Sequence, residues 1–136
     1  MPQPGELIHV SAALITDDAG RLLVVRKRGT SVFMQPGGKP APGESPAQTL
    51  SRELAEELGA IVSADELEPL GSFTAAAANE AGATVVAEVF RVRLSAPVAA
   101  AAEIAELRWI HPREFATLAL APLITEHMLP LLHSGT

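Results

Sequence analysis

Three glutamates near the middle of the chain have the residue type and the spacing that metal-ion chemistry needs. Glu53, Glu56 and Glu57 follow one another at i, i+3 and i+4, so on a helix their carboxylates would share one face. Like charges at this spacing repel, and each pair costs a helix roughly 0.2–0.5 kcal/mol. Clustered carboxylates beside an exposed backbone carbonyl suit hard divalent cations such as Mg²⁺ or Mn²⁺. The alternative explanation is a solvated acidic face.

The helix that must carry these glutamates has clear signals at both ends. Ser45 is a good N-cap, Pro46 suits the first helical position, and Gln48 completes a capping box. Gly59 suits the left-handed conformation that ends many helices. We therefore predict a helix over residues 46–58. A neighbouring face of small and aliphatic residues should pack into the core: Ala47, Leu50, Leu54 and Leu58.

A loop rich in glycine and proline leads into this helix. It contains Gly37, Gly38 and Lys39, and Glu44 stands at the entrance of the helix. Arg52 lies beside the three glutamates and can offset only part of their charge. Elsewhere the sequence has neither a G-x-S-x-G elbow nor a Walker loop, and its four histidines have no metal-ligand spacing. Function therefore rests on the loop and the helix.

This stretch resembles the Nudix box, G-x5-E-x7-R-E-U-x-E-E-x-G-U, in which U is a bulky aliphatic residue. Every fixed residue is present at the right spacing: Gly38, Glu44, Arg52-Glu53-Leu54, Glu56-Glu57 and Gly59. The one departure is Ala60, where the family usually has Ile, Leu or Val, and it puts local packing in doubt more than chemistry. So many fixed positions make the motif specific, whereas outside the box the resemblance extends only to element order.

The resemblance implies roles for the glutamates of the box. Glu53, Glu56 and Glu57 would bind the metal ion, with the carbonyl of Gly37 as a further ligand. Glu53 could instead act as the general base, because families within the superfamily differ in this respect. Mg²⁺ is the expected cofactor, and Mn²⁺ could replace it.

Other charged residues would support this site. Arg52 and Glu44 would hold the loop to the helix through an ion pair or hydrogen bonds. The family often uses one more glutamate outside the box, for which Glu103 is favoured over Glu106 and Glu88. An ordinary surface carboxylate is the competing explanation for each of these three.

Basic residues near the loop are candidates for contact with phosphate. Arg26 and Arg28 end a predicted strand upstream of the loop, where simple solvation explains them equally well. Lys39, within the loop, is the basic residue that we most expect near a phosphate. With Gly38, these three residues form our predicted substrate-binding set.

The resemblance implies a hydrolase that splits a pyrophosphate linkage in a nucleoside diphosphate linked to another group, X. Divalent ions would neutralise the substrate and lower the pKa of a bound water, and a carboxylate would accept its proton. The short chain without an added domain favours a nucleoside triphosphate, while dinucleoside polyphosphates, ADP-ribose and nucleotide sugars stay open. The alternatives are a non-catalytic nucleotide-binding Nudix-like regulatory module, which would commonly lack some box glutamates, and a structural domain with a chance acidic face.

Composition limits the other classes of function. At 136 residues we expect one domain, 1–136, and the net charge of −6 argues against non-specific nucleic-acid binding. No apolar stretch approaches the roughly 20 residues of a membrane span, and the start of the chain does not resemble a signal peptide. The absence of cysteine fits a reducing cytoplasm, which is our predicted location. A homodimer is an open alternative to a monomer.

The remaining pattern predicts a mixed sheet between helices, an α/β or α+β sandwich. The resemblance implies the Nudix form of it, an α/β/α sandwich. We expect the first two strands to form a hairpin around a turn at residues 17–20. The expected strands are 7–16, 21–28, 32–35, 67–78, 83–94 and 106–111, and the other helices are 112–115 and one from Pro122 onward.

Overall fold

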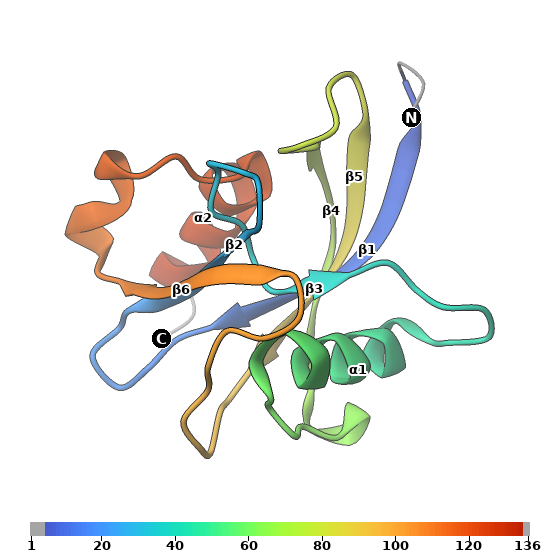
Figure 1. Ribbon diagram of the computed structural model, residues 1–136, viewed down its shortest axis with the longest axis horizontal. Helices are drawn as coiled ribbons and strands as arrows, with labels where there is room; N and C mark the ends of the chain where they lie inside the picture. The colour runs from blue at the N-terminus through green and yellow to red at the C-terminus, as the bar shows by residue number, and fades with distance from the viewer. Residues whose placement is uncertain (1–4, 135–136) are drawn as a thin grey trace.

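The computed structural model describes residues 5–134, which form six strands and a set of helices (Figure 1). The strands are β1 (Leu7–Ile15), β2 (Leu22–Lys27), β3 (Gly37–Gly38), β4 (Glu68–Ala76), β5 (Thr84–Val92) and β6 (Ile104–Ile110). The α-helices are α1 (Pro46–Leu58) and α2 (Leu129–Ser134). Short 3-10 helices span Ala64–Glu66 and Pro112–Thr117, and a π-helical turn, Ile124–Met128, runs directly into α2.

The strands divide into two sheets. Four of them pair in the order β3-β1-β5-β4, with β1 and β5 parallel and the outer two antiparallel to their neighbours. β2 and β6 form a second, antiparallel pair. The prediction of a mixed sheet between helices is confirmed, and the division into two sheets is an addition to it.

Alternate residues of β1 enter different parts of the core. Ala12 and Leu14 pack in the cluster that contains the C-terminal helical residues, whereas Ala13 and Ile15 pack in the cluster that contains the buried side of α1. This is the period-2 pattern of a strand covered on both faces. In Figure 1, α1 and the C-terminal helices accordingly lie on opposite sides of the strands.

The expected hairpin between the first two strands is wrong. The turn is present, because Asp17 N–H donates to the Arg21 carbonyl at 3.1 Å and Thr16 forms an isolated bridge with Leu22. Beyond that point the strands diverge: β1 pairs with β5 over nine residues, and β2 pairs with β6. Both strands are apolar on both faces, so their alternation does not specify a partner.

α1 forms where the sequence predicted it. The Ser45 hydroxyl accepts from Gln48 N–H, the reciprocal bond of the capping box is present, and Gly59 adopts the left-handed conformation with φ 69°. Leu50, Leu54 and Leu58 are buried, and Ala47 is partly buried against them. Ala60 is also buried, so the small residue at the variable end of the box lies within the core. Among the described residues, no helix combines the length and the apolar character needed to cross a membrane.

Candidate active site

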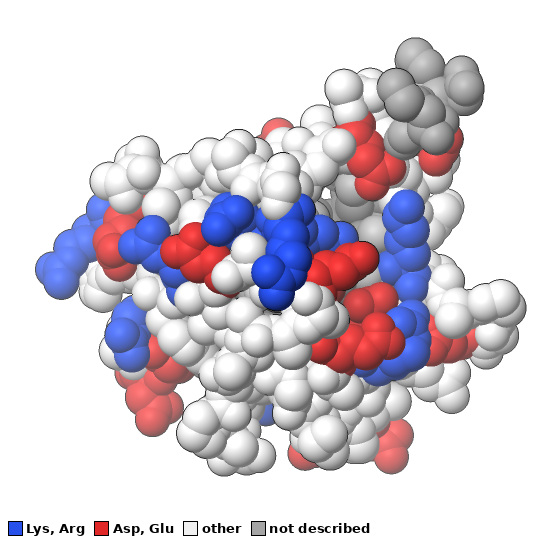
Figure 2. All heavy atoms as spheres, in the orientation of Figure 1, with Lys and Arg blue, Asp and Glu red and all other residues white. Residues whose placement is uncertain are grey.

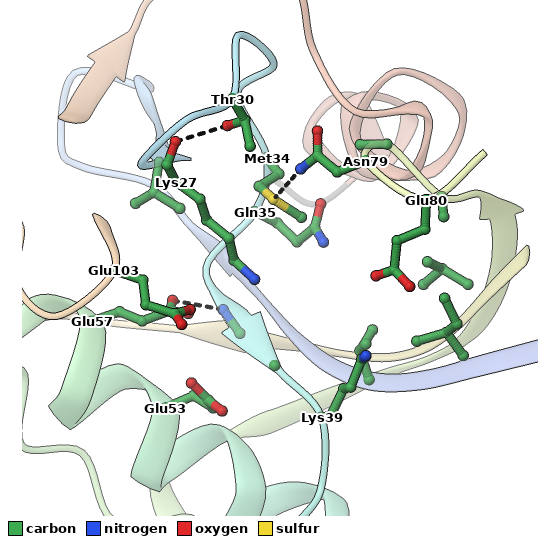
Figure 3. Close-up of a pocket in the computed structure, with 18 of the residues that line it drawn as sticks. Lys27, Thr30, Met34, Gln35, Lys39, Glu53, Glu57, Asn79, Glu80 and Glu103 are labelled. Atoms are coloured by element: carbon green, nitrogen blue, oxygen red, sulfur yellow. Dashed lines mark hydrogen bonds between the residues drawn. The ribbon is translucent and has the colours of Figure 1, made fainter. Parts of the chain in front are cut away.

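A cavity of about 620 Å³ lies between α1, β1, β2 and the loop that joins β4 to β5 (Figure 3). At one end Glu53 and Glu57 of α1 face Glu103 of the loop before β6, and Lys27 of β2 reaches toward them. We call this the carboxylate end. Figure 2 shows acidic side chains gathered beside basic ones where α1 meets β3.

Two glycines bring the backbone of β3 against both β1 and α1. Gly37 has a φ of 143°, and a Cβ there would collide with the carbonyl oxygen of Ser11. A Cβ on Gly38 would collide with the carboxylate of Glu53. Because neither glycine carries a side chain, Gly37 N–H can donate to Glu57 Oε1 at 3.1 Å. The absence of a side chain at Gly37 and Gly38 is thus a steric requirement of the site.

Arg52 joins the loop to the helix. Its Nε and Nη2 donate to the two carboxylate oxygens of Glu44 at 2.7 and 3.0 Å, a bidentate pair, and Nη2 also donates to the Lys39 carbonyl at 3.1 Å. Its Nη1 donates to Glu53 and Glu56 at 3.1 Å each. The ion pair that we expected between loop and helix is present, and it extends to two glutamates of the box.

Glu44 is held in its ionised form. Besides the Arg52 guanidinium, which is the main cause, the backbone N–H of Ala41 at 2.7 Å and the hydroxyl of Thr49 at 3.0 Å donate to its carboxylate. These contacts lower the pKa of Glu44 to about 2. The carboxylate therefore anchors the loop across the ordinary pH range.

The carboxylates that face the cavity have raised pKa values, in contrast to Glu44. Burial raises the pKa of Glu57 to about 7, since only 7% of the residue is exposed. The Gly37 N–H and the charge of Lys27 oppose this rise, whereas the charges of Glu53 and Glu103 add to it. Burial also raises the pKa of Glu53, although Arg52 opposes it. Both anions would gain from a further positive charge in the cavity.

The donor set fits a hard divalent cation in its chemistry, but the box glutamates are not all turned toward one point. Among residues 5–134, no three His, Cys, Asp or Glu side chains stand close enough to hold a metal ion as placed. Glu56 does not line the cavity, and its half-exposed side chain is paired with Arg52. Glu53, Glu57 and Glu103 do line it, and all three offer oxygen ligands.

The structure distinguishes among the three glutamates considered outside the box. Glu103 lies beside Glu57 (Figure 3), in a loop fixed by hydrogen bonds from Ala101 N–H to the Glu57 carbonyl and from Arg28 N–H to the Glu103 carbonyl, both 2.9 Å. Glu106 instead forms an ion pair with Arg26 at 3.2 Å. Glu88 lies in β5, where it pairs with Ser11 of β1, and is not part of the lining.

The basic residues near the loop differ in whether they line the cavity. Lys39 and Arg28 line the cavity, as expected of phosphate ligands. Arg26 does not, because its guanidinium donates to Glu106 and, at 2.8 Å, to the Thr30 carbonyl. Lys27 does line it, although our predicted substrate-binding set included its neighbours Arg26 and Arg28 but not Lys27 itself. Its signal was strand alternation, which places it on the same face as Val25, another lining residue.

Residues 7–132 match the family model of the NUDIX domain. The chain belongs to the Nudix family. The resemblance to the Nudix family is thereby confirmed, and it extends beyond the box to nearly the whole chain. The solved Nudix hydrolase from Nitrosomonas europaea has the same fold, with a TM-score of 0.77 and 24% identity over 96% of this chain and 90% of that one.

Two curated relatives of this Nudix domain have different activities. It is 35% identical over 130 residues to isopentenyl-diphosphate Delta-isomerase of Nocardia farcinica, covering 88% of this chain and 73% of that protein. It is 36% identical over 66 residues to 8-oxo-dGTP diphosphatase of Haemophilus influenzae, covering 46% of this chain and 48% of that protein. With the family match, the diphosphatase relative supports the assignment of this chain as a Nudix hydrolase. Hydrolases of this family act on small nucleotides and generally use a divalent metal ion.

Proposed function

We propose that this Nudix hydrolase splits the pyrophosphate linkage of a nucleoside triphosphate, or of a related nucleoside diphosphate linked to X, by attack of water at phosphorus. The observation that carries the proposal is the carboxylate end of the cavity. There Glu53 and Glu57 are desolvated carboxylates, Glu103 faces them, and Lys27 and Lys39 supply positive charge to the same cavity. Oxygen ligands and cations around one space suit a metal-bound polyphosphate.

Glu53 and Glu57 would hold a divalent cation, Mg²⁺ or Mn²⁺, with Glu56 and the Gly37 carbonyl as further candidate ligands. When bound, the cation would neutralise phosphate oxygens and make a bound water more acidic. For Glu56 to take part, its carboxylate would have to leave Arg52, with which it is now paired at 3.1 Å. Its half-exposed side chain has the freedom to do so.

The chain's own residues would orient the substrate and move the proton. Lys27, Lys39 and Arg28 would bind phosphate oxygens, and the Gly38 backbone would border them. Glu103, which lines the cavity, would accept the proton of the attacking water, and Glu53 is the alternative base. Glu44 would act through Arg52, by keeping loop and helix in register.

A second candidate function comes from the isomerase relative. Its identity covers 88% of this chain, and its substrate, like a nucleotide, carries a diphosphate. Isomerisation of an alkene would need an acid and a base on either side of a carbon skeleton, chemistry that the carboxylate end could also serve. The two candidates share the phosphate end of the substrate and differ in the group beyond it.

A substrate panel separates them. The purified chain is incubated with Mg²⁺ and each nucleoside triphosphate, 8-oxo-dGTP, ADP-ribose or isopentenyl diphosphate, and products are separated by chromatography. We expect nucleoside monophosphate and pyrophosphate from at least one triphosphate, and unchanged isopentenyl diphosphate. Isomer formation without nucleotide hydrolysis would replace the proposed function with the second candidate. Nucleotide binding without any product would favour the regulatory module.

A cytoplasmic location and the homodimer stay predictions. Fractionation of the cells and the mass of the purified protein in solution would test them.

A further inference from the structure

The cavity extends beyond the carboxylate end to a region that the Nudix box does not describe. Here the lining is mainly aliphatic: Ile8, Val10, Met34, Ala77, Ala78 and Val85. Among the described residues that line the cavity, none is aromatic. Three polar side chains, Gln35, Asn79 and Glu80, stand around this apolar floor (Figure 3). We call this region the amide end.

Gln35 has an unusual environment. Its Oε1 atom is the one buried side-chain nitrogen or oxygen in residues 5–134 without a hydrogen-bond partner. Native proteins satisfy most buried polar groups, so an unsatisfied one calls for a specific explanation. Gln35 is only partly buried and lines the cavity between Met34 and the glycines of β3, so its side chain borders the space that a ligand would occupy.

The backbone on both sides of Gln35 is fixed. Met34 exchanges two hydrogen bonds with Val25, at 2.7 and 2.8 Å, and the Pro36 carbonyl accepts from Ala13 N–H at 2.9 Å. The segment is therefore held to β2 on one side and to β1 on the other. The amide is presented from a rigid position, which is a requirement for reading the shape of a ligand.

Asn79 brings a second amide to the same region. It belongs to the loop between β4 and β5, and its Nδ2 contacts the sulfur of Met34 at 3.8 Å. A thioether is a weak acceptor, so a ligand with a stronger acceptor could replace this contact at little cost. Figure 3 shows Gln35 and Asn79 on the same side of the cavity, with Glu80 next to Asn79.

We propose that Gln35 and Asn79 form the polar side of a nucleobase subsite, in which their amides hydrogen-bond the edge of the base and the aliphatic floor contacts its face. An amide offers both donors and an acceptor, which matches the mixed donor and acceptor edge of a base. A hydrocarbon chain offers neither and would leave the Gln35 amide unsatisfied. The inference rests on the proposed function and deepens it, because it selects a nucleotide over an isoprenoid diphosphate.

The test uses Gln35→Met, which keeps the size of the side chain and removes its hydrogen bonds. Steady-state kinetics are measured with the preferred nucleoside triphosphate and with methyl triphosphate, which has no base. We expect KM for the nucleotide to rise about tenfold with kcat changed less than about twofold, and methyl triphosphate to be hydrolysed as by the wild type. An unchanged nucleotide KM, or an equal loss with both substrates, would overturn the inference.

Asn79→Ala is the second variant, because Asn79 lies in a loop and its truncation leaves the core intact. We expect a smaller rise in nucleotide KM, about threefold, and again no effect on methyl triphosphate. Glu126→Gln, on the exposed side of the C-terminal helical segment, is the control and should match the wild type. Thermal unfolding of each variant shows whether a change in KM accompanies a loss of fold.

Binding of nucleoside monophosphates, measured by calorimetry, separates the failure of this inference from that of the proposed function. If the wild type hydrolyses nucleotides and Gln35→Met binds the monophosphate equally well, the subsite is wrong and the function stands. If the wild type hydrolyses no nucleotide but Gln35→Met weakens monophosphate binding, the function is wrong and the subsite stands.

Discussion

The two ends of the cavity are built on different principles. The carboxylate end is organised by a local motif: a capped helix, two glycines that admit a close approach, and an arginine that ties loop to helix. The amide end is assembled from β1, the segment before β3 and the loop between β4 and β5. The comparison suggests that reaction type is encoded locally in this chain, whereas substrate choice depends on segments that meet only in the folded protein.

The largest effect should come from the centre of the carboxylate end. Glu57→Gln keeps the shape of the side chain but removes the buried anion, so we expect kcat for the preferred nucleotide to fall by about 10²–10⁴-fold. KM should change much less, because the amide end is untouched. The Glu126→Gln variant serves as the control. A kcat within about twofold of the wild type would remove Glu57 from the reaction.

Removing the arginine that joins loop and helix should have an intermediate effect. Arg52→Gln loses the bidentate pair with Glu44 and the contacts to Glu53 and Glu56. We expect kcat to fall about 30-fold, since misplacement of catalytic groups costs up to about 10²-fold. Because Arg52 acts through other residues, the pH profile of kcat should shift with the pKa of Glu53. A fall in kcat with the profile unmoved would contradict this positioning role.

Adjacent basic residues of β2 offer a matched pair. Lys27 lines the cavity, whereas Arg26 is bound to Glu106 and the Thr30 carbonyl. We expect Lys27→Ala to raise the nucleotide KM about tenfold, because it removes a charge-assisted contact to phosphate, and Arg26→Ala to leave KM within about twofold. Equal effects of the two substitutions would show that the cavity assignment of Lys27 is wrong.

A further effect is on stability and depends on pH. The pKa of Glu57 is about 7 in the fold, above its ordinary value of 4.5, so the folded state holds this proton more tightly than the unfolded state. The associated stability is complete below about pH 4.5 and is lost as pH rises to about 7, on the order of 3 kcal/mol. Denaturant unfolding in the presence of a chelator should show this loss in the wild type and much less of it in Glu57→Gln. Identical pH profiles of the two proteins would contradict the raised pKa of Glu57.

The parts of the structure that the sequence predicted are those with local causes. α1 begins at Pro46 and ends at Leu58 as expected, because capping and the Gly59 stop act within a few residues. The hairpin failed since β1 and β2 are apolar on both faces and their long partners, β5 and β6, lie 77 or more residues away along the chain. Partner choice between such strands is decided by tertiary packing.

In the site, too, the sequence predicted part of the arrangement and missed the rest. Glu53, Glu57 and Glu103 reach the cavity, and so do Arg28 and Lys39. Glu56 was assigned from the family resemblance and Arg26 from its position upstream of the loop, but each is paired with an oppositely charged neighbour that the sequence does not reveal. Gln35 carried no sequence signal, because what distinguishes it is an unsatisfied atom in the folded chain. The catalytic, metal-binding and substrate-binding roles of these residues stay predictions.

Metal binding at the carboxylate end is the most direct test of the central proposal, that buried glutamates of the Nudix box hold a divalent cation. Mn²⁺ is titrated into the wild type, Glu57→Gln and Glu126→Gln without nucleotide, and the dissociation constant is measured by calorimetry. We predict that the wild type and Glu126→Gln bind Mn²⁺ with equal affinity and that Glu57→Gln binds it at least about tenfold more weakly. Removing a residue that only orients a metal ligand typically costs about tenfold or more in affinity, and removing a ligand itself should cost at least as much. Equal affinity in all three proteins would contradict the account.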